Sequence, residues 1–121
     1  MKKILIVDDH KDIRNLVENT LKSDRFVFLQ AEKGEEAIDI ALKIKPDLIL
    51  MDIMMSEGID GLEATRRLKR NPETKDSFII MLSAKGKKED YKNGFEAGAD
   101  DYFEKPFSPL RLMNKVEEVL K

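Results

Sequence analysis

The stretch Ile4–His10, ILIVDDH, joins four aliphatic residues directly to two adjacent carboxylates. An unbroken aliphatic run of this kind predicts a strand that is buried on both faces. Asp8 and Asp9 would then stand at the end of the core, where a carboxylate is costly to bury unless a partner stabilises it. The stretch therefore predicts a central strand and, at its end, a site that makes use of two acids.

Apolar runs of the same kind recur along the chain, and between them apolar residues are spaced as on one face of a helix. Further buried strands are predicted at Phe26–Leu29, Leu48–Met51, Phe78–Leu82 and, more weakly, Tyr102–Phe103. Helices are predicted around the stretches Ile13–Leu21, Ala37–Leu42, Leu62–Leu68, Gly86–Ala97 and Leu112–Leu120, with Leu16, Leu42 and Met113 on their apolar faces. Strict alternation of strands and helices predicts an α/β fold, a doubly wound five-stranded parallel sheet with helices on both faces.

Two helix starts have clear signals. Asp60 followed by Glu63 has the spacing of a capping box. Ser108 followed by Pro109 is typical of an N-cap with proline at the first helical position. We therefore expect the third helix to begin after Asp60 and the last after Ser108.

Composition excludes several classes of protein. The 121 residues fit one domain, residues 1–121, and the absence of cysteine excludes disulfides and thiolate metal sites. The net charge of -2, from 22 basic and 24 acidic residues, argues against nucleic-acid binding by this domain, which needs a basic excess. The apolar runs are too short for a membrane span or a signal peptide. We expect a cytoplasmic protein without a membrane partner.

The predicted architecture brings three acids together. In an open doubly wound sheet, ligands bind beyond the carboxyl ends of the strands. Asp8 and Asp9 follow the first strand and Asp52 follows the third, so these carboxylates converge if the two strands are neighbours. Their mutual repulsion would be relieved by a hard divalent cation, and Mg²⁺ favours a few carboxylates together with water and phosphate oxygens. The sequence therefore predicts a Mg²⁺ site with room for a phosphoryl group.

Two more residues suit phosphoryl chemistry. Ser83 ends the fourth predicted strand and Lys105 ends the fifth. A phosphoryl group in transfer carries charge on three equatorial oxygens, which Mg²⁺, an ammonium and a hydroxyl can neutralise or bind. A carboxylate such as Asp52 can itself serve as the nucleophile and form an aspartyl phosphate.

Over its whole length the chain resembles the receiver domains of two-component response regulators. The matching motifs, in order, are IVDD, KPDLILMDIMM, IDG, LSAK and GADDYFEKPF, followed by the terminal helix. The resemblance implies the strand order 2-1-3-4-5. It also implies a signalling switch, not a turnover enzyme, which is phosphorylated on Asp52 by a histidine kinase or a histidine phosphotransfer protein.

The resemblance also assigns roles around Asp52. Asp8 and Asp9 match the family's acid pair, with Asp9 favoured as the direct metal ligand, and the backbone carbonyl of Met54 matches the third protein ligand. Mg²⁺ is the expected ion, and Mn²⁺ can take its place. Ser83 matches the hydroxyl that follows the phosphoryl group, and Lys105 matches the lysine that pairs with it.

The output is expected at a face made by the fourth helix, the fifth strand and the fifth helix, where Tyr102 matches the family's aromatic switch. This face would dock a downstream protein or output domain. The Lys105–Pro106 peptide is expected to be cis. Met54 and Lys85 match two variable positions that flank the path of the hydrolytic water, so we expect them to set the lifetime of the phosphoryl group. Neither side chain can act as a base at neutral pH, which predicts slow hydrolysis.

The chain departs from the family pattern in the loop after Asp52, DIMMSEGIDG. Ser56 stands where proline is usual, and the path to Gly61 is one residue longer. The departure lies after Met54, so we expect its effect on the path of the loop and on the start of the third helix.

Two other functions compete with this interpretation. A Mg²⁺-dependent phosphohydrolase of the haloacid-dehalogenase type would place its aspartates as D-x-D, whereas this chain has adjacent aspartates. A receiver that only binds a partner would not need Asp52, Ser83 and Lys105. His10 is the one histidine of the chain and is expected to be exposed at a helix start and not a ligand. The sequence leaves open a single-domain receiver or part of a longer regulator.

Overall fold

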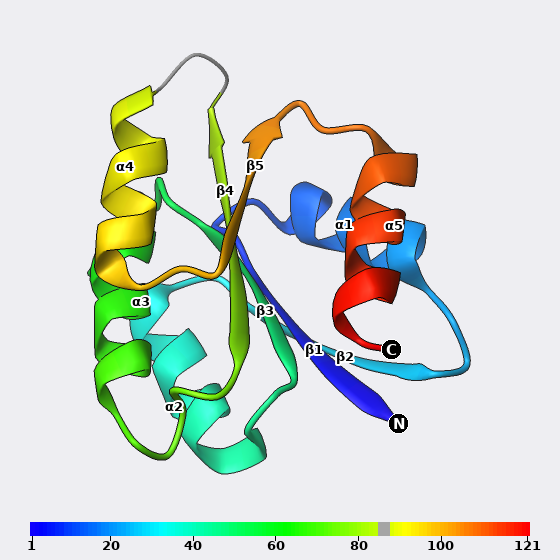
Figure 1. Ribbon diagram of the computed structural model, residues 1–121, viewed down its shortest axis with the longest axis horizontal. Coiled ribbons are helices and arrows are strands. Elements are labelled where there is room, and N and C mark those ends of the chain that lie inside the picture. The colour runs from blue at the N-terminus through cyan, green and yellow to red at the C-terminus, as the bar shows by residue number, and fades with distance from the viewer. Residues whose placement is uncertain (85–87) are drawn as a thin grey trace.

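Strands and helices alternate five times in the computed structural model, which describes residues 1–84 and 88–121 (Figure 1). The strands are β1 (Lys2–Val7), β2 (Phe26–Ala31), β3 (Leu48–Asp52), β4 (Phe78–Ala84) and β5 (Asp101–Lys105). The helices are α1 (Lys11–Leu21), α2 (Gly34–Ile44), α3 (Gly61–Arg70), α4 (Lys88–Ala97) and α5 (Pro109–Val119). Each predicted element is present, although α4 is described only from Lys88 onward.

The strands form one parallel sheet in the order β2-β1-β3-β4-β5, which confirms the predicted fold. In the register of the central pair, Val7 lies opposite Met51. The next residues, Asp8 and Asp52, therefore lie side by side at the carboxyl edge of the sheet. Between β4 and β5 the register sets Ala84 opposite Lys105, at the same edge.

Alternate side chains of the sheet pack into two separate cores. Leu5, Ile49 and Met81 face α2 and α3, where Ala37, Ala41, Ala64 and Leu68 complete one cluster. Ile4, Leu50 and Ile80 face α1 and α5, where Val17, Leu21, Leu112 and Val116 complete the other. Figure 1 shows the helices α1 and α5 on one side of the sheet and α2, α3 and α4 on the other. Because successive side chains of a strand point to opposite faces, each strand supplies apolar side chains to both cores.

Some apolar residues that were predicted to be buried are exposed in the structure. The stretch Phe26–Leu29 was predicted to be buried on both faces, but Val27 is 41% exposed because β2 lies at the sheet edge and pairs with β1 alone. Leu16, Leu42 and Met113 were placed on apolar helix faces and are exposed. On α1 the buried face instead runs through Arg14, Val17 and Leu21, which keep the three- and four-residue spacing of one helix face.

Both predicted caps are present. The Asp60 carboxylate accepts a hydrogen bond from the backbone N–H of Glu63 at 2.9 Å, and the Ser108 hydroxyl accepts one from Arg111 at 3.4 Å. The Glu63 carboxylate binds Arg66 and Arg67, so only the Asp60 half of the capping box forms. Within residues 1–84 and 88–121, no helix combines the length and the apolar character that a membrane crossing requires.

Candidate functional site

The carboxyl edge of the sheet gathers three aspartates. Asp8 and Asp9 follow β1, and Asp52 is the last residue of β3. Asp8 and Asp52 are 1% and 4% exposed, so both carboxylates lie largely out of water. Two buried charges of the same sign are unfavourable unless a cation lies between them.

Lys105 supplies such a cation from the end of β5. Its ammonium lies 3.1 Å from Asp8 Oδ2 and 3.0 Å from Asp52 Oδ1. Burial, together with repulsion from Asp8, still raises the pKa of the Asp52 carboxyl to about 6. Burial lowers the pKa of Lys105, but attraction to Asp52 and Asp8 outweighs it and leaves the pKa raised. Lys105 is therefore positively charged at neutral pH, and it lies beside a carboxylate whose ionisation is unfavourable.

Asp9 is held by the loop that follows β3. Its Oδ2 accepts a hydrogen bond from the backbone N–H of Ser56 at 3.0 Å. Its Oδ1 is buried, accepts no hydrogen bond from the described residues, and lies 2.9 Å from His10 Nδ1. Burial raises the pKa of Asp9, but hydrogen bonds from Ser56 and attraction to His10 lower it overall.

These acids fit a divalent cation. Among the described residues, one group of potential ligands has donor atoms within 4.8 Å of one another, and it consists of Asp8, Asp9 and His10. The buried, unbonded oxygen of Asp9 and the hard oxygen donors suit Mg²⁺. Asp52 is not in this group and is linked to Asp8 through Lys105. The Met54 side chain is exposed, and the role of its carbonyl stays a prediction.

Ser83 and Tyr102 lie together on the side of the site toward β5. Ser83 is buried, and its hydroxyl is hydrogen-bonded to the Tyr102 hydroxyl. The half-buried Tyr102 ring packs edge-on against Tyr91 of α4, with ring centroids 4.6 Å apart. Ser83 and Tyr102, predicted as separate parts of the switch, are thus in direct contact. Lys85, which was predicted to influence phosphoryl lifetime, lies outside the described residues.

The longer loop after β3 is tied to the start of α2. Lys33 pairs with Glu57 at 3.1 Å, and the Glu35 carboxylate accepts the Ile59 N–H at 3.3 Å. Gly58 adopts a φ of 72°, which a side chain would rarely allow. The extra residue is therefore absorbed by contacts with α2, and α3 still begins at Gly61.

Gly61 allows α3 to start directly against the site. Its N–H donates to the Ile53 carbonyl at 2.9 Å, and a Cβ atom here would lie 2.1 Å from the Asp52 carbonyl oxygen. No side chain fits at that distance. The Lys105–Pro106 peptide on the other side of the site is cis, as the resemblance implied.

Two residues that were not predicted to belong to the site contact its acids. The buried Arg14 donates from its guanidinium to the Asp8 carbonyl at 2.7 Å and to the Gln30 side chain at 3.0 Å. Its spacing from Val17 was the available signal. His10 is exposed at the start of α1, as expected, but its imidazole also lies beside both acids.

Comparison with known proteins places this geometry in a family. The family model described as the response regulator receiver domain matches residues 4–117. The chain is 45% identical over 120 residues to the phosphate regulon transcriptional regulatory protein PhoB of Pseudomonas aeruginosa, covering 99% of this chain and 52% of that protein. It is 44% identical over 119 residues to the transcriptional regulatory protein ResD of Bacillus subtilis, covering 98% and 48%.

The chain thus spans about half the length of the curated relatives it matches. Among solved structures, a putative response regulator from Chloroflexus aurantiacus superposes with a TM-score of 0.92 at 37% identity, covering 98% of this chain and 97% of that one. The chemotaxis response regulator CheY4 of Vibrio cholerae gives 0.88 at 31% identity, covering 98% of each. The chain belongs to the response-regulator receiver-domain family.

Proposed function

We propose that residues 1–121 form one receiver domain in which Asp52 accepts a phosphoryl group from a histidine kinase or a histidine phosphotransfer protein. The observation that carries the proposal is the position of Lys105, whose ammonium bridges Asp8 and Asp52 at the carboxyl edge of the sheet. It offers a fixed positive charge where the oxygens of an incoming phosphoryl group would lie. The domain works in the cytoplasm, where its donor presents phosphohistidine.

The chemistry follows from the two oxygens of Asp52. Lys105 holds Oδ1, which leaves Oδ2 to attack phosphorus. The O–P bond of an aspartyl phosphate forms as the N–P bond of phosphohistidine breaks, and its electron pair remains on the imidazole. Mg²⁺ or Mn²⁺ bound by Asp8, Asp9, Asp52 and the Met54 carbonyl would supply further charge neutralisation at the phosphoryl oxygens.

Ser83 and Tyr102 would pass the state of Asp52 to the surface. The Ser83 hydroxyl is bonded to Tyr102 and would have to leave it to bind a phosphoryl oxygen. The Tyr102 ring, which packs on Tyr91, would then turn inward and change the contact between β5 and α4. This exchange shifts the face between two populations.

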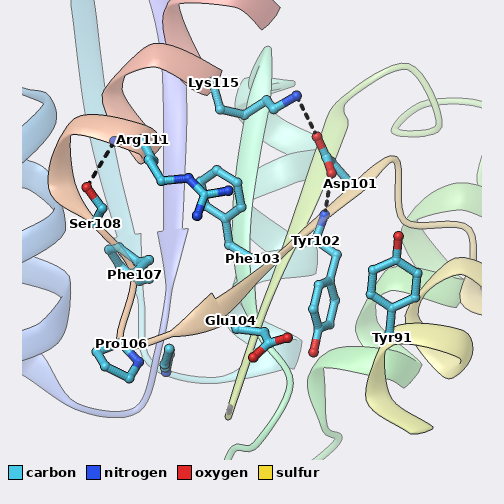
Figure 2. A pocket seen from close by; sticks show the side chains of 11 residues that line it. Tyr91, Asp101, Tyr102, Phe103, Glu104, Pro106, Phe107, Ser108, Arg111 and Lys115 are labelled. Atoms are coloured by element: carbon cyan, nitrogen blue, oxygen red, sulfur yellow. Dashed lines mark hydrogen bonds and ion pairs between the residues drawn. The ribbon is translucent and has the colours of Figure 1, made fainter. Parts of the chain in front are cut away.

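A groove of about 600 Å³ marks this face, shown in Figure 2. Tyr91 and Tyr102 line one side, and Phe107 and Arg111 line the other. Asp101 and Lys115 form an ion pair of 3.0 Å across it. We propose this α4–β5–α5 face as the dock for a downstream protein or output domain, with no nucleic acid or membrane bound by the receiver itself. Amide shifts that change on phosphorylation everywhere except this face would refute the switch.

One experiment separates this function from its rivals. Incubation with acetyl phosphate and Mg²⁺, followed by intact mass, should show one added phosphoryl group that persists for minutes and is absent in EDTA. A phosphohydrolase would release phosphate continuously without retaining the mass. A module that only binds a partner would do neither. The phosphohydrolase remains the less favoured alternative, since its D-x-D pattern is missing.

A further inference from the structure

The two acids after β1 share an unusual division of their oxygens. Asp8 Oδ2 binds the Lys105 ammonium at 3.1 Å, and Asp9 Oδ2 accepts the Ser56 N–H at 3.0 Å. The Oδ2 atom of each acid is therefore bonded to a part of the protein other than His10. The other oxygen of each, Oδ1, lies close to the same nitrogen atom, His10 Nδ1.

His10 is the N-cap of α1, and its position is fixed by the backbone. Its N–H donates to Asp8 Oδ1 at 2.8 Å, while Arg14 holds the Asp8 carbonyl. The imidazole is 72% exposed, and its Nδ1 lies within hydrogen-bonding distance of both acids. It makes no capping hydrogen bond, so capping does not explain its orientation.

The spacing of the three atoms matches a metal coordination sphere. His10 Nδ1 lies 2.9 Å from Asp9 Oδ1 and 3.2 Å from Asp8 Oδ1. First-row divalent ions bind nitrogen and oxygen at about 2.1 Å, so neighbouring ligands of an octahedral ion lie about 3 Å apart. The buried Asp9 Oδ1 accepts no hydrogen bond from the described residues and is free to coordinate.

We propose that His10 is a metal ligand, which together with Asp8 and Asp9 makes this a mixed nitrogen and oxygen site. An imidazole nitrogen adds much to the binding of Co²⁺, Ni²⁺ or Zn²⁺ and little to that of Mg²⁺, which prefers oxygen and water. The site therefore selects transition-metal ions over Mg²⁺ more strongly than its two carboxylates alone would. The inference rests on the proposed function only in taking Asp8 and Asp9 as metal ligands.

The competing explanation is a simple ion pair, in which a protonated His10 neutralises the two carboxylates. The two explanations differ in what removal of the imidazole does. Loss of an ion-pair partner would leave the affinities for all divalent ions unchanged or raise them together. Loss of a ligand would lower the affinity for Co²⁺ and Ni²⁺ selectively.

The test compares wild type with His10→Gln, which keeps a polar side chain, and with Asp9→Asn. Protein without a histidine tag is titrated with Mg²⁺ and with Co²⁺ by calorimetry, and thermal melting checks that each variant is folded. We expect His10→Gln to weaken Co²⁺ binding about 10- to 100-fold, by comparison with the loss of outer ligand partners. Its Mg²⁺ affinity should stay within about threefold, because Mg²⁺ gains little from nitrogen.

A spectroscopic readout gives the direct assignment. His10 is the one histidine of the chain, so a hyperfine-shifted imidazole N–H proton in the Co²⁺-loaded wild type can come from no other side chain. The signal should be absent in His10→Gln. Equal Co²⁺ affinity in wild type and His10→Gln, or an equal loss for both ions, would overturn the inference. If wild type binds neither ion, the metal site of the proposed function fails as well.

Discussion

Strands β3 and β5 both contribute residues to the candidate site, but they differ in burial. All five residues of β3 are buried, and the strand ends in Asp52. In β5 four residues are half-buried and one is exposed, yet it carries Tyr102 and Lys105. Under the proposed function, the buried central strand would fix the acceptor Asp52, and the less buried edge strand would carry Tyr102 and Lys105, which respond to it.

The two strands also hold their charged residues, Asp52 and Lys105, in different ways. Asp52 is 4% exposed at the end of a strand that pairs with β1 on one side and with β4 on the other, so its carboxylate is largely desolvated. Lys105 reaches Asp8 and Asp52 from the sheet edge along a flexible stem. The Lys105 ammonium can therefore follow a change of charge at Asp52 through rotations of this stem.

The largest expected effect is on the rate of phosphorylation, when a substitution removes one acid of the site and leaves the edge strand β5 unchanged. Asp9→Asn should slow phosphorylation by acetyl phosphate about a hundredfold or more, the usual scale for losing one charge-stabilising group. Asp101→Asn on β5 is the comparison variant, because the Asp101 carboxylate binds Lys115 and the backbone N–H of Tyr102 and not Lys105. The measurement is the rate of mass gain in excess Mg²⁺. Equal rates for the two variants would remove Asp9 from the mechanism.

The next prediction tests the packing side of the contrast. Leu50→Ala in β3 deletes a side chain with no exposed surface and should cost about 3 kcal/mol of unfolding free energy. Leu110→Ala in α5 removes the same atoms from a side chain that is 64% exposed and should stay within about 0.5 kcal/mol. Urea unfolding measures both. Similar losses would mean that the core is not concentrated in the central strands.

A third prediction concerns pH and stability. The pKa of Asp52 is raised from 3.8 to about 6, so the folded state binds this proton more tightly than the unfolded state does. Ionisation therefore destabilises the fold, with no penalty below pH 3.8 and the full penalty above pH 6. In EDTA, Asp52→Asn should be more stable than wild type by about 2 kcal/mol at pH 7.5, after allowance for solvent screening.

The stability advantage of Asp52→Asn should disappear as the pH falls toward 4. Urea unfolding of both proteins across this range checks it, with Asp101→Asn as the control from β5. An advantage that is the same at every pH would show that amide packing, and not charge, explains it.

The smallest expected effect concerns the lifetime of the phosphoryl group. Met54 is exposed beside Asp52 and offers a hydrolytic water no strong hydrogen bond. Met54→Asn combined with Lys85→Glu should shorten the lifetime a few-fold, because each replacement can bind or orient that water. Decay of the phosphorylated mass in excess Mg²⁺ compares wild type, both single variants and the double variant. Unchanged decay in all four would show that these side chains do not retard the water.

Much of the fold could be predicted because its signals are local. Buried strands appear as unbroken apolar runs, and Asp60 and Ser108 mark helix starts by their own hydrogen bonds. Burial at the sheet edge could not be predicted in the same way. Val27 belongs to an apolar run, and only the strand order shows that β2 has a single neighbour.

The candidate site likewise contains residues that local signals predict and contacts that depend on the folded structure. Asp8, Asp9, Asp52 and Lys105 lie at the carboxyl ends of their strands, so the alternation of strands and helices already placed them at one edge of the sheet. The contacts of Ser56 with Asp9 and of Arg14 with the Asp8 carbonyl depend on a loop path and a helix rotation. Neither contact can be predicted from residue spacing. Each uses a backbone group, either the carbonyl of Asp8, which every residue type can offer, or the N–H of Ser56, which every residue type except proline can offer.

The most direct test of the account is the site of phosphorylation itself. Wild type, Asp52→Asn and Asp101→Asn are incubated with acetyl phosphate and Mg²⁺, and intact mass is followed over time. We predict one added phosphoryl group in wild type and in Asp101→Asn, and none in Asp52→Asn. Full labelling of Asp52→Asn would contradict the claim that the buried carboxylate beside Lys105 is the acceptor.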